Sequence, residues 1–469
     1  MSTPTPLLVR GGRVVTLDAA LGDLTPGDVL IAGGTIRAVA PAIDVGPECA
    51  VLDARGMIVS PGFVDVHRHV WQTQLRTVAT DWTLFDYLCR MRLGYSAFYE
   101  PDDVYLGNYA GALEALHAGI TTLVDHCHII NSPAHADEAV RGLRDAGIAG
   151  IFCYGLFPNP TLPDFAVDFE PGWRLDDARR VRARHFAASD DLLTLGLAPT
   201  EVTAQPLATV RRELAFAREL GARRISCHVG MGRYDRGDRL VARLDEAGEL
   251  RDDVLLVHGA ALDADELARV AASGAAIAAT PETELQMGMG RPVSFRARAA
   301  GVATGLGIDI VSNYAGDMFA QMRLQLQAER GFRHAGARGA PRRLGLHARD
   351  VLELATVGGA RALGLEHRIG TLAPGKRADV VLTRTDSINM LPATDPVGAL
   401  VLNATTHDVD TVLVAGRAVK RAGALVGVDW PALAARLETS ARRIHAAFAA
   451  VPLARIEALM APMMGVADE

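Results

Sequence analysis

PGFVDVHRH, residues 61–69, joins an apolar run to two histidines that stand two positions apart. The apolar run predicts a buried strand. Because residues i and i+2 of an extended strand point to the same side, the imidazoles of His67 and His69 can reach one ion. The H-x-H spacing is weak by itself, since His126 and His128 form a second such pair. The buried strand that precedes His67 favours the first pair as part of a metal site.

Strand-like runs alternate with helical stretches from about residue 61 to 365. This alternation predicts a parallel sheet with crossover helices, and eight strands within roughly 300 residues favour a closed (β/α)8 TIM-like barrel. An open doubly wound sheet is the alternative, but no G-x-G-x-x-G follows a first strand. The expected strands are 62–67, 121–125, 150–153, 192–197, 224–228, 254–258, 275–279 and 302–309.

Reactive groups of such barrels lie at the carboxyl ends of the strands, where the chain can bring distant residues together. Here the first strand ends with His67 and His69, the fifth with His228, the sixth with His258 and the eighth with Asp309. Imidazole nitrogens with one carboxylate suit zinc or ferrous iron and leave a coordination position for water. We therefore expect these residues to meet around one ion at the barrel mouth.

The two ends of the chain have a different pattern from the middle. Residues 1–60 and 369–428 both consist of short strand-like runs separated by glycine turns. Each block alone is a thin sheet with little to pack on, so we expect the two blocks to form one composite β-sandwich. The barrel then spans 61–368, and the tail 429–469 is expected to be a helical packing element because its apolar residues have helical spacing.

The charge and cysteine content restrict the class of protein. The net charge is −7 and the pI about 6.1, which argues against a nucleic-acid or anionic-membrane partner. The five cysteines are an odd number without C-x-x-C spacing, so a reducing cytoplasm is the simpler expectation. The N-terminus does not have the pattern of a signal peptide, and no apolar run reaches the roughly 18 residues of a membrane helix.

Four segments together resemble the amidohydrolase superfamily, in particular its chlorohydrolase and aminohydrolase branch, which is cytosine-deaminase-like. Residues 61–69 resemble the P-G-F-V-D-x-H-x-H signature, and 257-VHGAAL-262 with 305-GLGID-309 resemble downstream motifs of that branch. The stretch 370-GTLAPGKRAD-379 resembles the return of the family's chain into its composite sandwich. The resemblance covers nearly the whole chain in order and implies the same barrel-plus-sandwich fold.

The resemblance also implies roles for individual residues. His67, His69, His228 and Asp309 would bind one divalent metal, with Zn²⁺ preferred and Fe²⁺ as the alternative. Asp309 would in addition accept a proton from the attacking water, and His258 would stabilise developing charge beside the metal. The implied partner is a small-molecule substrate. Barrels of this family often associate, so a homo-oligomer is an open alternative.

One position departs from the pattern of the aminohydrolases. Their fifth-strand histidine is followed three residues later by a proton-shuttling glutamate, whereas this chain has Met231 there. The acid either is relocated, with Glu201, Glu282 or Glu284 as candidates, or is not needed. Hydrolysis of an amide or related acyl bond can proceed with Asp309 alone, so that reaction is expected slightly ahead of deamination of an N-heterocycle. A non-enzymatic binding protein is the third hypothesis, against which the intact ligand set argues.

The long loop after the first strand supplies further candidates for substrate binding. It contains Trp71, Gln72 and Trp82, and aromatic side chains with a few amides suit a flat or apolar substrate. His128, from the second H-x-H pair, is a further candidate for substrate contact. Glu201 as a bridge to a second metal is a remaining alternative, because residues 195–201 contain no lysine that could be carbamylated.

Overall fold

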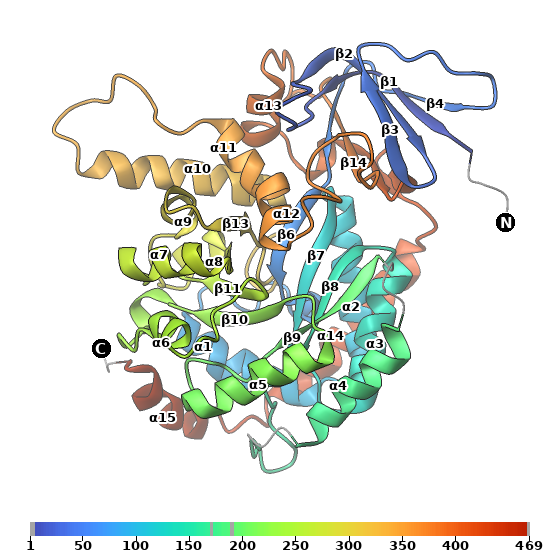
Figure 1. Cartoon of the computed structure of the whole chain (residues 1–469). Helices are drawn as coiled ribbons and strands as arrows, with labels where there is room; N and C mark the ends of the chain where they lie inside the picture. The colour runs from blue at the N-terminus through green and yellow to red at the C-terminus, as the bar shows by residue number, and fades with distance from the viewer. Residues whose placement is uncertain (1–4, 169–171, 188–191, 467–469) are drawn as a thin grey trace.

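The protein contains two β-sheets, one of which is surrounded by helices, in a computed structural model that describes residues 5–168, 172–187 and 192–466 (Figure 1). One sheet is an eight-stranded parallel barrel, and the other is a mixed sheet built from both ends of the chain. The predicted combination of a (β/α)8 barrel and a composite β-structure is therefore confirmed. Residues 1–4 of the expected N-terminal sheet segment and residues 467–469 of the expected helical tail lie outside the described residues.

The barrel strands follow one another in sequence order around the sheet, as crossover helices require. Their apolar residues are buried on both faces, which is why each strand reads as a continuous hydrophobic run. The last strand is shorter than expected, because the chain leaves it before Asp309. The strands are β6 Phe63–Arg68, β7 Ile120–Cys127, β8 Ala149–Gly155, β9 Leu193–Ala198, β10 Ile225–Val229, β11 Val254–His258, β12 Ala276–Ala279 and β13 Ala303–Leu306.

Main-chain hydrogen bonds of Asp309 close the barrel between its first and last strands. The Asp309 N–H donates to the His67 carbonyl at 2.8 Å, and the His69 N–H donates to the Asp309 carbonyl at 2.7 Å. Arg68 and Asp309 thereby form an isolated parallel bridge. The buried Asp65 carboxylate supports this closure by accepting the Ile308 N–H at 3.0 Å. The closing bonds thus join the residues that the sequence predicts as metal ligands.

Helices surround the barrel, and short helical turns occupy the segment after β6. That segment, expected as a loop, forms η1 Val70–Leu75, α1 Leu84–Asp86, η2 Tyr87–Arg92 and η3 Tyr95–Phe98. The expected helices 207–220 and 263–272 are present as α5 and α7, the latter begun by an Asp263 side-chain cap. The helices between residues 101 and 362 are α2 Pro101–His117, α3 Pro133–Ala146, α4 Gly172–His185, α5 Leu207–Leu220, η4 Gly232–Tyr234, α6 Leu240–Glu246, α7 Ala264–Ser273, α8 Pro281–Gln286, α9 Ser294–Ala299, α10 Met318–Ala335, α11 Ala348–Glu353, η5 Leu354–Gly358 and α12 Gly359–Ala362.

The second sheet joins the two ends of the chain. Strand β5 pairs antiparallel with β14, and the start of β3 with the turn before it hydrogen-bonds to residues 375–378, so that the sheet folds back on itself. A separate apolar core fills its interior. The strands, with two short helices among them, are β1 Leu7–Val14, β2 Leu24–Ala32, β3 Thr35–Ala40, β4 Ala50–Asp53, β5 Met57–Pro61, β14 Val380–Arg384, α13 Pro396–Leu402, η6 Thr406–Asp408, β15 Val409–Val414, β16 Arg417–Arg421 and β17 Ala424–Leu425.

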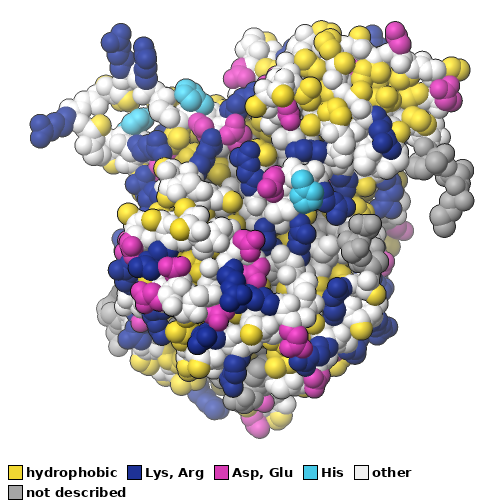
Figure 2. Space-filling model, viewed as in Figure 1, with side chains coloured by type: hydrophobic (Ala, Val, Ile, Leu, Met, Phe, Trp, Pro, Cys, Tyr) yellow, Lys and Arg dark blue, Asp and Glu magenta, His cyan; other side chains and the backbone are white. Residues whose placement is uncertain are grey.

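The tail of the chain forms two helices, α14 Trp430–Phe448 and α15 Leu453–Met464. Within the described residues no single helix is long and apolar enough to cross a membrane; α14 and α15 pass that test only as a pair, and they are bent by 82° to each other. Figure 2 shows Lys and Arg side chains spread among Asp and Glu over the barrel helices, while hydrophobic side chains gather over β1–β4. All five cysteines are free.

We predict that Leu382→Ala destabilises the composite sheet. Leu382 in β14 is fully buried, lies opposite Val59 of β5 and belongs to the shared apolar core. The cavity left by the truncation should lower the free energy of unfolding by about 2–5 kcal/mol. Chemical denaturation measures the loss. The matched control is Val51→Ala in β4, at a side chain that is 47% exposed, which should cost less than about 0.5 kcal/mol. Equal losses in the two variants would contradict a shared core.

Candidate metal centre

Four side chains from three parts of the barrel converge at its mouth. The Asp309 Oδ1 atom lies 3.3 Å from His67 Nε2 and 3.4 Å from His69 Nε2. His228 Nε2 lies 3.4 Å from His67 Nε2. Ligand atoms of the three histidines all lie within 4.8 Å of one another. One ion can therefore contact all four side chains.

The strand geometry explains this convergence. His67 lies near the end of β6, His69 directly follows that strand, and His228 lies near the end of β10. Asp309 follows β13 by three residues and has a φ of 69°, a left-handed conformation that a non-glycine residue seldom adopts. This turn keeps the carboxylate beside the imidazoles while the Asp309 main chain closes the barrel.

Burial and the contacts within the cluster keep His67, His69 and Asp309 in their metal-binding protonation states. Burial lowers the pKa of His67 to about 4 and that of His69 well below its usual value, so both imidazoles are neutral and have lone pairs to offer. Burial acts to raise the pKa of Asp309, but the contact with His67 outweighs it and holds this carboxyl well below its usual pKa. Neutral imidazoles and an ionised carboxylate are the forms that bind a divalent cation.

His258 lies beside this cluster at the end of β11. Its ring stacks on His228 with centroids 5.5 Å apart, and its backbone has a φ of 74°. The Thr280 hydroxyl contacts His258 Nδ1 at 3.0 Å, which leaves Nε2 as the nitrogen available to a substrate. The position fits a group that stabilises charge next to the ion.

The second H-x-H pair packs against the first. The His126 carbonyl contacts His69 Nδ1 at 2.8 Å, and the His128 ring stacks on the His69 ring at 3.9 Å. The Trp71 indole N–H donates to His128 Nδ1 at 3.1 Å. This bond fixes Nδ1 as the acceptor nitrogen of His128, whose ring lines the cavity.

The three candidate acids lie in different places. Glu201 faces the cavity, and its carboxylate oxygens lie 3.1 and 3.2 Å from His228 Nδ1. Burial acts to raise the pKa of Glu201, but the contact with His228 outweighs it and leaves the pKa below its usual value. Glu284 is fully buried and accepts the Thr280 N–H at 2.9 Å, while Glu282 accepts a hydrogen bond from Gln321. Only Glu201 of the three lines the cavity.

The cavity above the cluster has a volume of 710 Å³ and is lined by His69, His128, His228, His258 and Asp309 among others. Trp71, Gln72 and Trp82, expected to bind substrate, are not among its lining residues. Gln72 instead donates to the Tyr87 hydroxyl at 2.6 Å behind the wall. Trp71 and Gln72 turn away because η1 points them into the protein core, whereas Trp82 follows η1 and packs, partly buried, against that core.

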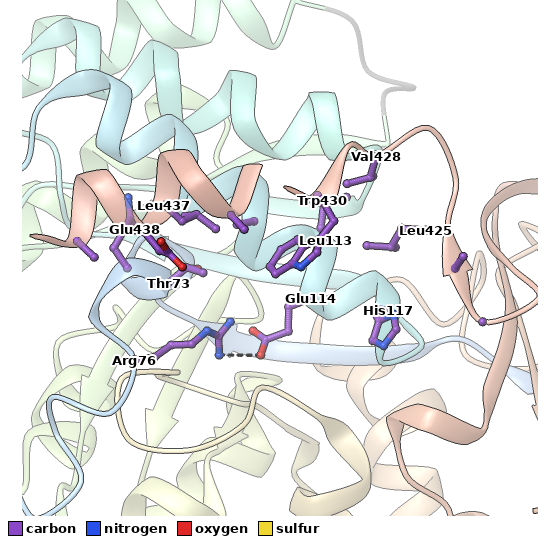
Figure 3. A pocket seen from close by; sticks show the side chains of 16 residues that line it. Thr73, Arg76, Leu113, Glu114, His117, Leu425, Val428, Trp430, Leu437 and Glu438 are labelled. Atoms are coloured by element: carbon purple, nitrogen blue, oxygen red, sulfur yellow. Dashed lines mark hydrogen bonds and ion pairs between the residues drawn. The ribbon is translucent and has the colours of Figure 1, made fainter. Parts of the chain in front are cut away.

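A cavity of 800 Å³ lies outside the barrel mouth, between α2 and α14 (Figure 3). Apolar side chains such as Leu113, Leu437 and Trp430 line it, and Arg76 and Glu114 form an ion pair of 2.9 Å at its edge. None of the candidate metal ligands borders this groove. Size alone therefore does not identify the site, whereas the ligand cluster does.

Several residues that hold the site were not singled out from the sequence. Asp65 buttresses the barrel closure, and the buried Arg92 donates to the His128 carbonyl at 3.1 Å and to the Asn159 side chain. Asp65 stands inside the 61–69 stretch, so its place in that apolar run was a usable signal. Arg92 offered no such signal, because only the fold brings its loop to the end of β7.

The profile of the amidohydrolase family matches residues 58–419, which include the barrel and all four candidate ligands. The chain belongs to the amidohydrolase family. The expected resemblance to the amidohydrolase superfamily is therefore confirmed. The matched residues contain both the barrel and the cluster of histidines of this amidohydrolase.

Relatives of this amidohydrolase match over nearly its whole length. A 5-methylthioadenosine/S-adenosylhomocysteine deaminase of Desulforudis audaxviator is 31% identical, covering 93% of this chain and 99% of the relative. The crystal structure of an adenosine deaminase from Xanthomonas campestris with bound zinc has a TM-score of 0.82 at 25% identity, covering 94% of this chain and 98% of that one. Atrazine chlorohydrolase from Arthrobacter aurescens, complexed with zinc, has the same fold, with a TM-score of 0.82 at 24% identity over 93% of this chain and 100% of that one.

The donor set of this amidohydrolase fits a divalent metal. Three imidazoles and one carboxylate match the nitrogen and oxygen ligands of catalytic zinc sites, which keep one position open for water. Glu201 at His228 and the His126 carbonyl at His69 orient two of the imidazoles through their other ring nitrogens.

We predict that His69→Ala loses metal and activity together. The variant removes one donor and leaves Asp309 without one of its two imidazole neighbours. Metal analysis after repletion should find well under one equivalent per chain, against about one in the wild type. The matched control is His117→Ala, in the lining of the cavity between α2 and α14 (the outer groove), which should retain its metal. A His69→Ala variant with stoichiometric metal and normal turnover would contradict the assignment.

Proposed function

We propose that the protein is a zinc-dependent hydrolase of a non-peptide C–N bond in a small molecule, and that it removes ammonia from an amino-substituted N-heterocycle. The observation that carries the proposal is the convergence of three imidazoles and one carboxylate on a cavity that also contains an acid and a further histidine. The deaminase relatives at about the full length of the chain support this choice over amide hydrolysis.

His67, His69, His228 and Asp309 would hold the metal. When bound, a divalent metal supplies a water of lowered pKa and an electrostatic pull on the substrate. Because its histidine contacts keep Asp309 ionised, the second carboxylate oxygen is a suitable acceptor for the proton of the attacking water. His258 would form a hydrogen bond with the attacking oxygen, where charge develops.

Deamination also requires a proton for the ring nitrogen and one for the departing ammonia. Water provides the oxygen of the product and both protons, so the protein must carry them from one side of the substrate to the other. Glu201 supports this role, because it lies at the end of the adjacent strand β9 and faces the cavity. Met231 occupies the position of the usual acid and has no proton to give.

Hydrolysis of an amide or related acyl bond is the second candidate. The observation in its favour is Met231 itself, because an acyl substrate has no ring nitrogen to protonate and Asp309 alone could pass the proton to the leaving amine. A cytoplasmic location stays a prediction from the cysteine content.

Substrate panels should separate the two reactions. We expect the zinc-loaded enzyme to release ammonia from amino-substituted heterocycles with a kcat/KM of about 10⁴ M⁻¹s⁻¹ or more for the best compound. N-alkyl amides of matching size should react at least about 100-fold more slowly, because the site holds an acid for a ring nitrogen they do not have. Amine release from the amides with no ammonia from the heterocycles would establish the second candidate instead.

We predict that Glu201→Gln lowers kcat by about 10²–10⁴-fold when the metal is supplied at saturation, because the amide cannot transfer a proton. Metal content must be measured on the same sample, since Glu201 also orients His228. Glu438→Gln, in the outer groove, is the matched control and should retain full activity. If Glu282→Gln or Glu284→Gln has the large loss instead, with metal retained, the relocated acid is that residue.

A further inference from the structure

Methionines are concentrated around the cavity of the metal site. The chain has 12 methionines, and six of them line this one cavity: Met231, Met287, Met289, Met460, Met463 and Met464. Three come from the loops that follow β10 and β12, and three come from the terminal helix α15. The expected role of the tail as a packing helix therefore leaves out its contribution to the cavity wall.

Helix α15 is fixed across the barrel mouth by contacts to two different loops. Arg90 Nη2, in the segment after β6, forms an ion pair with Glu457 at 3.0 Å. Arg236 Nη1, in the segment after β10, donates to the Met463 carbonyl at 3.3 Å. Ile456 of α15 packs with Cys89 and Leu93 in a small apolar cluster. These contacts on both sides hold the methionine face of α15 over the cavity.

The cavity thus has two chemically different walls. Histidines and carboxylates surround the candidate metal position, whereas α15 contributes only methionine side chains to the lining. Leu84, Leu88 and Leu240 extend the apolar surface. Methionine is unbranched and polarisable, so it adapts its shape to an apolar ligand without a fixed pocket. A volume of 710 Å³ lies in the range that holds a whole drug-sized molecule, and a single heterocyclic ring would leave much of it unfilled.

We propose that α15 is a specificity element that selects substrates whose ring carries an apolar substituent. The substituent points away from the metal and rests on Met460, Met463 and Met464. The inference builds on the proposed function, since it assumes that the reacting ring sits at the metal. It assigns to the C-terminal helix, which lies outside the barrel, the recognition of the part of the substrate that does not react.

The test compares the binding of two unreactive ring analogues, identical except that one carries a short alkyl chain in place of hydrogen. Calorimetric titration into the zinc-loaded wild type should show the alkyl compound binding about tenfold more tightly or better, as buried methylene groups do in apolar pockets. In a variant with Met460→Gln, Met463→Gln and Met464→Gln, this preference should fall to about twofold, while the affinity for the unsubstituted ring stays unchanged.

The matched control is Leu459→Gln, on the same helix at a side chain that is 64% exposed and outside the cavity lining; it should keep the wild-type preference. If the triple variant does not fold, Met463→Gln alone, at a side chain 54% exposed, should lower the preference in part. Equal binding of both rings to the wild type, or an unchanged preference in the folded variant, would overturn the role of α15. Binding of neither ring would overturn the proposed function, and the inference with it.

Discussion

Two main-chain hydrogen bonds, from Asp309 to His67 and from His69 to Asp309, hold the rest of the structure in place. They are the bonds that close the barrel between β6 and the segment after β13. Because the same three residues point their side chains at one another, closing the barrel and assembling most of the candidate metal site are a single structural event. The Asp65 carboxylate stabilises this junction of the first and last strands by accepting a hydrogen bond from the Ile308 N–H. The left-handed backbone of Asp309 is stable only because this surrounding structure fixes it.

The barrel was predictable because its strands are buried on both faces. Expected strands such as 254–258 are mainly apolar, which favours burial on both faces, and the structure places β11 at Val254–His258. The meeting of His67 with His228 could be expected from the rule that parallel strands present their carboxyl ends at one mouth. What the sequence could not provide is side-chain direction after a strand ends. Trp71 and Gln72 belong to a helical turn that directs both into the core, and an aromatic-rich segment reads the same in either orientation.

The choice among the three acids was undecidable for the same reason. Glu201, Glu282 and Glu284 all follow barrel strands, and local sequence gives each the same standing. The local backbone after each strand decides which acid reaches the cavity. Helix α8 begins at Pro281 and directs Glu284 inward, where it binds the Thr280 N–H. The chain after β9 leaves Glu201 in the cavity beside His228. The tail illustrates a related limit. Helical spacing identifies the buried side of α14, but only the 82° bend between α14 and α15 brings the methionines of α15 to the cavity.

Met231 stands where the aminohydrolases have a glutamate, and this difference affects which groups of the site can transfer a proton. An acid three residues after His228 would sit on the same strand end and act independently of that imidazole. Glu201 comes from the neighbouring strand and contacts His228 Nδ1 directly. The contact stabilises the ionised carboxylate and orients the imidazole toward the candidate metal position. In the proposed mechanism, proton transfer and metal affinity are therefore coupled through one hydrogen bond. Met231 places an apolar side chain at the position that the acid has in the aminohydrolases, and it lines the same cavity as the methionines of α15. In the proposed reaction Glu201 carries the proton while Met231 belongs to the apolar part of the cavity lining, which links the position of the acid to the kind of substrate that we propose the cavity admits.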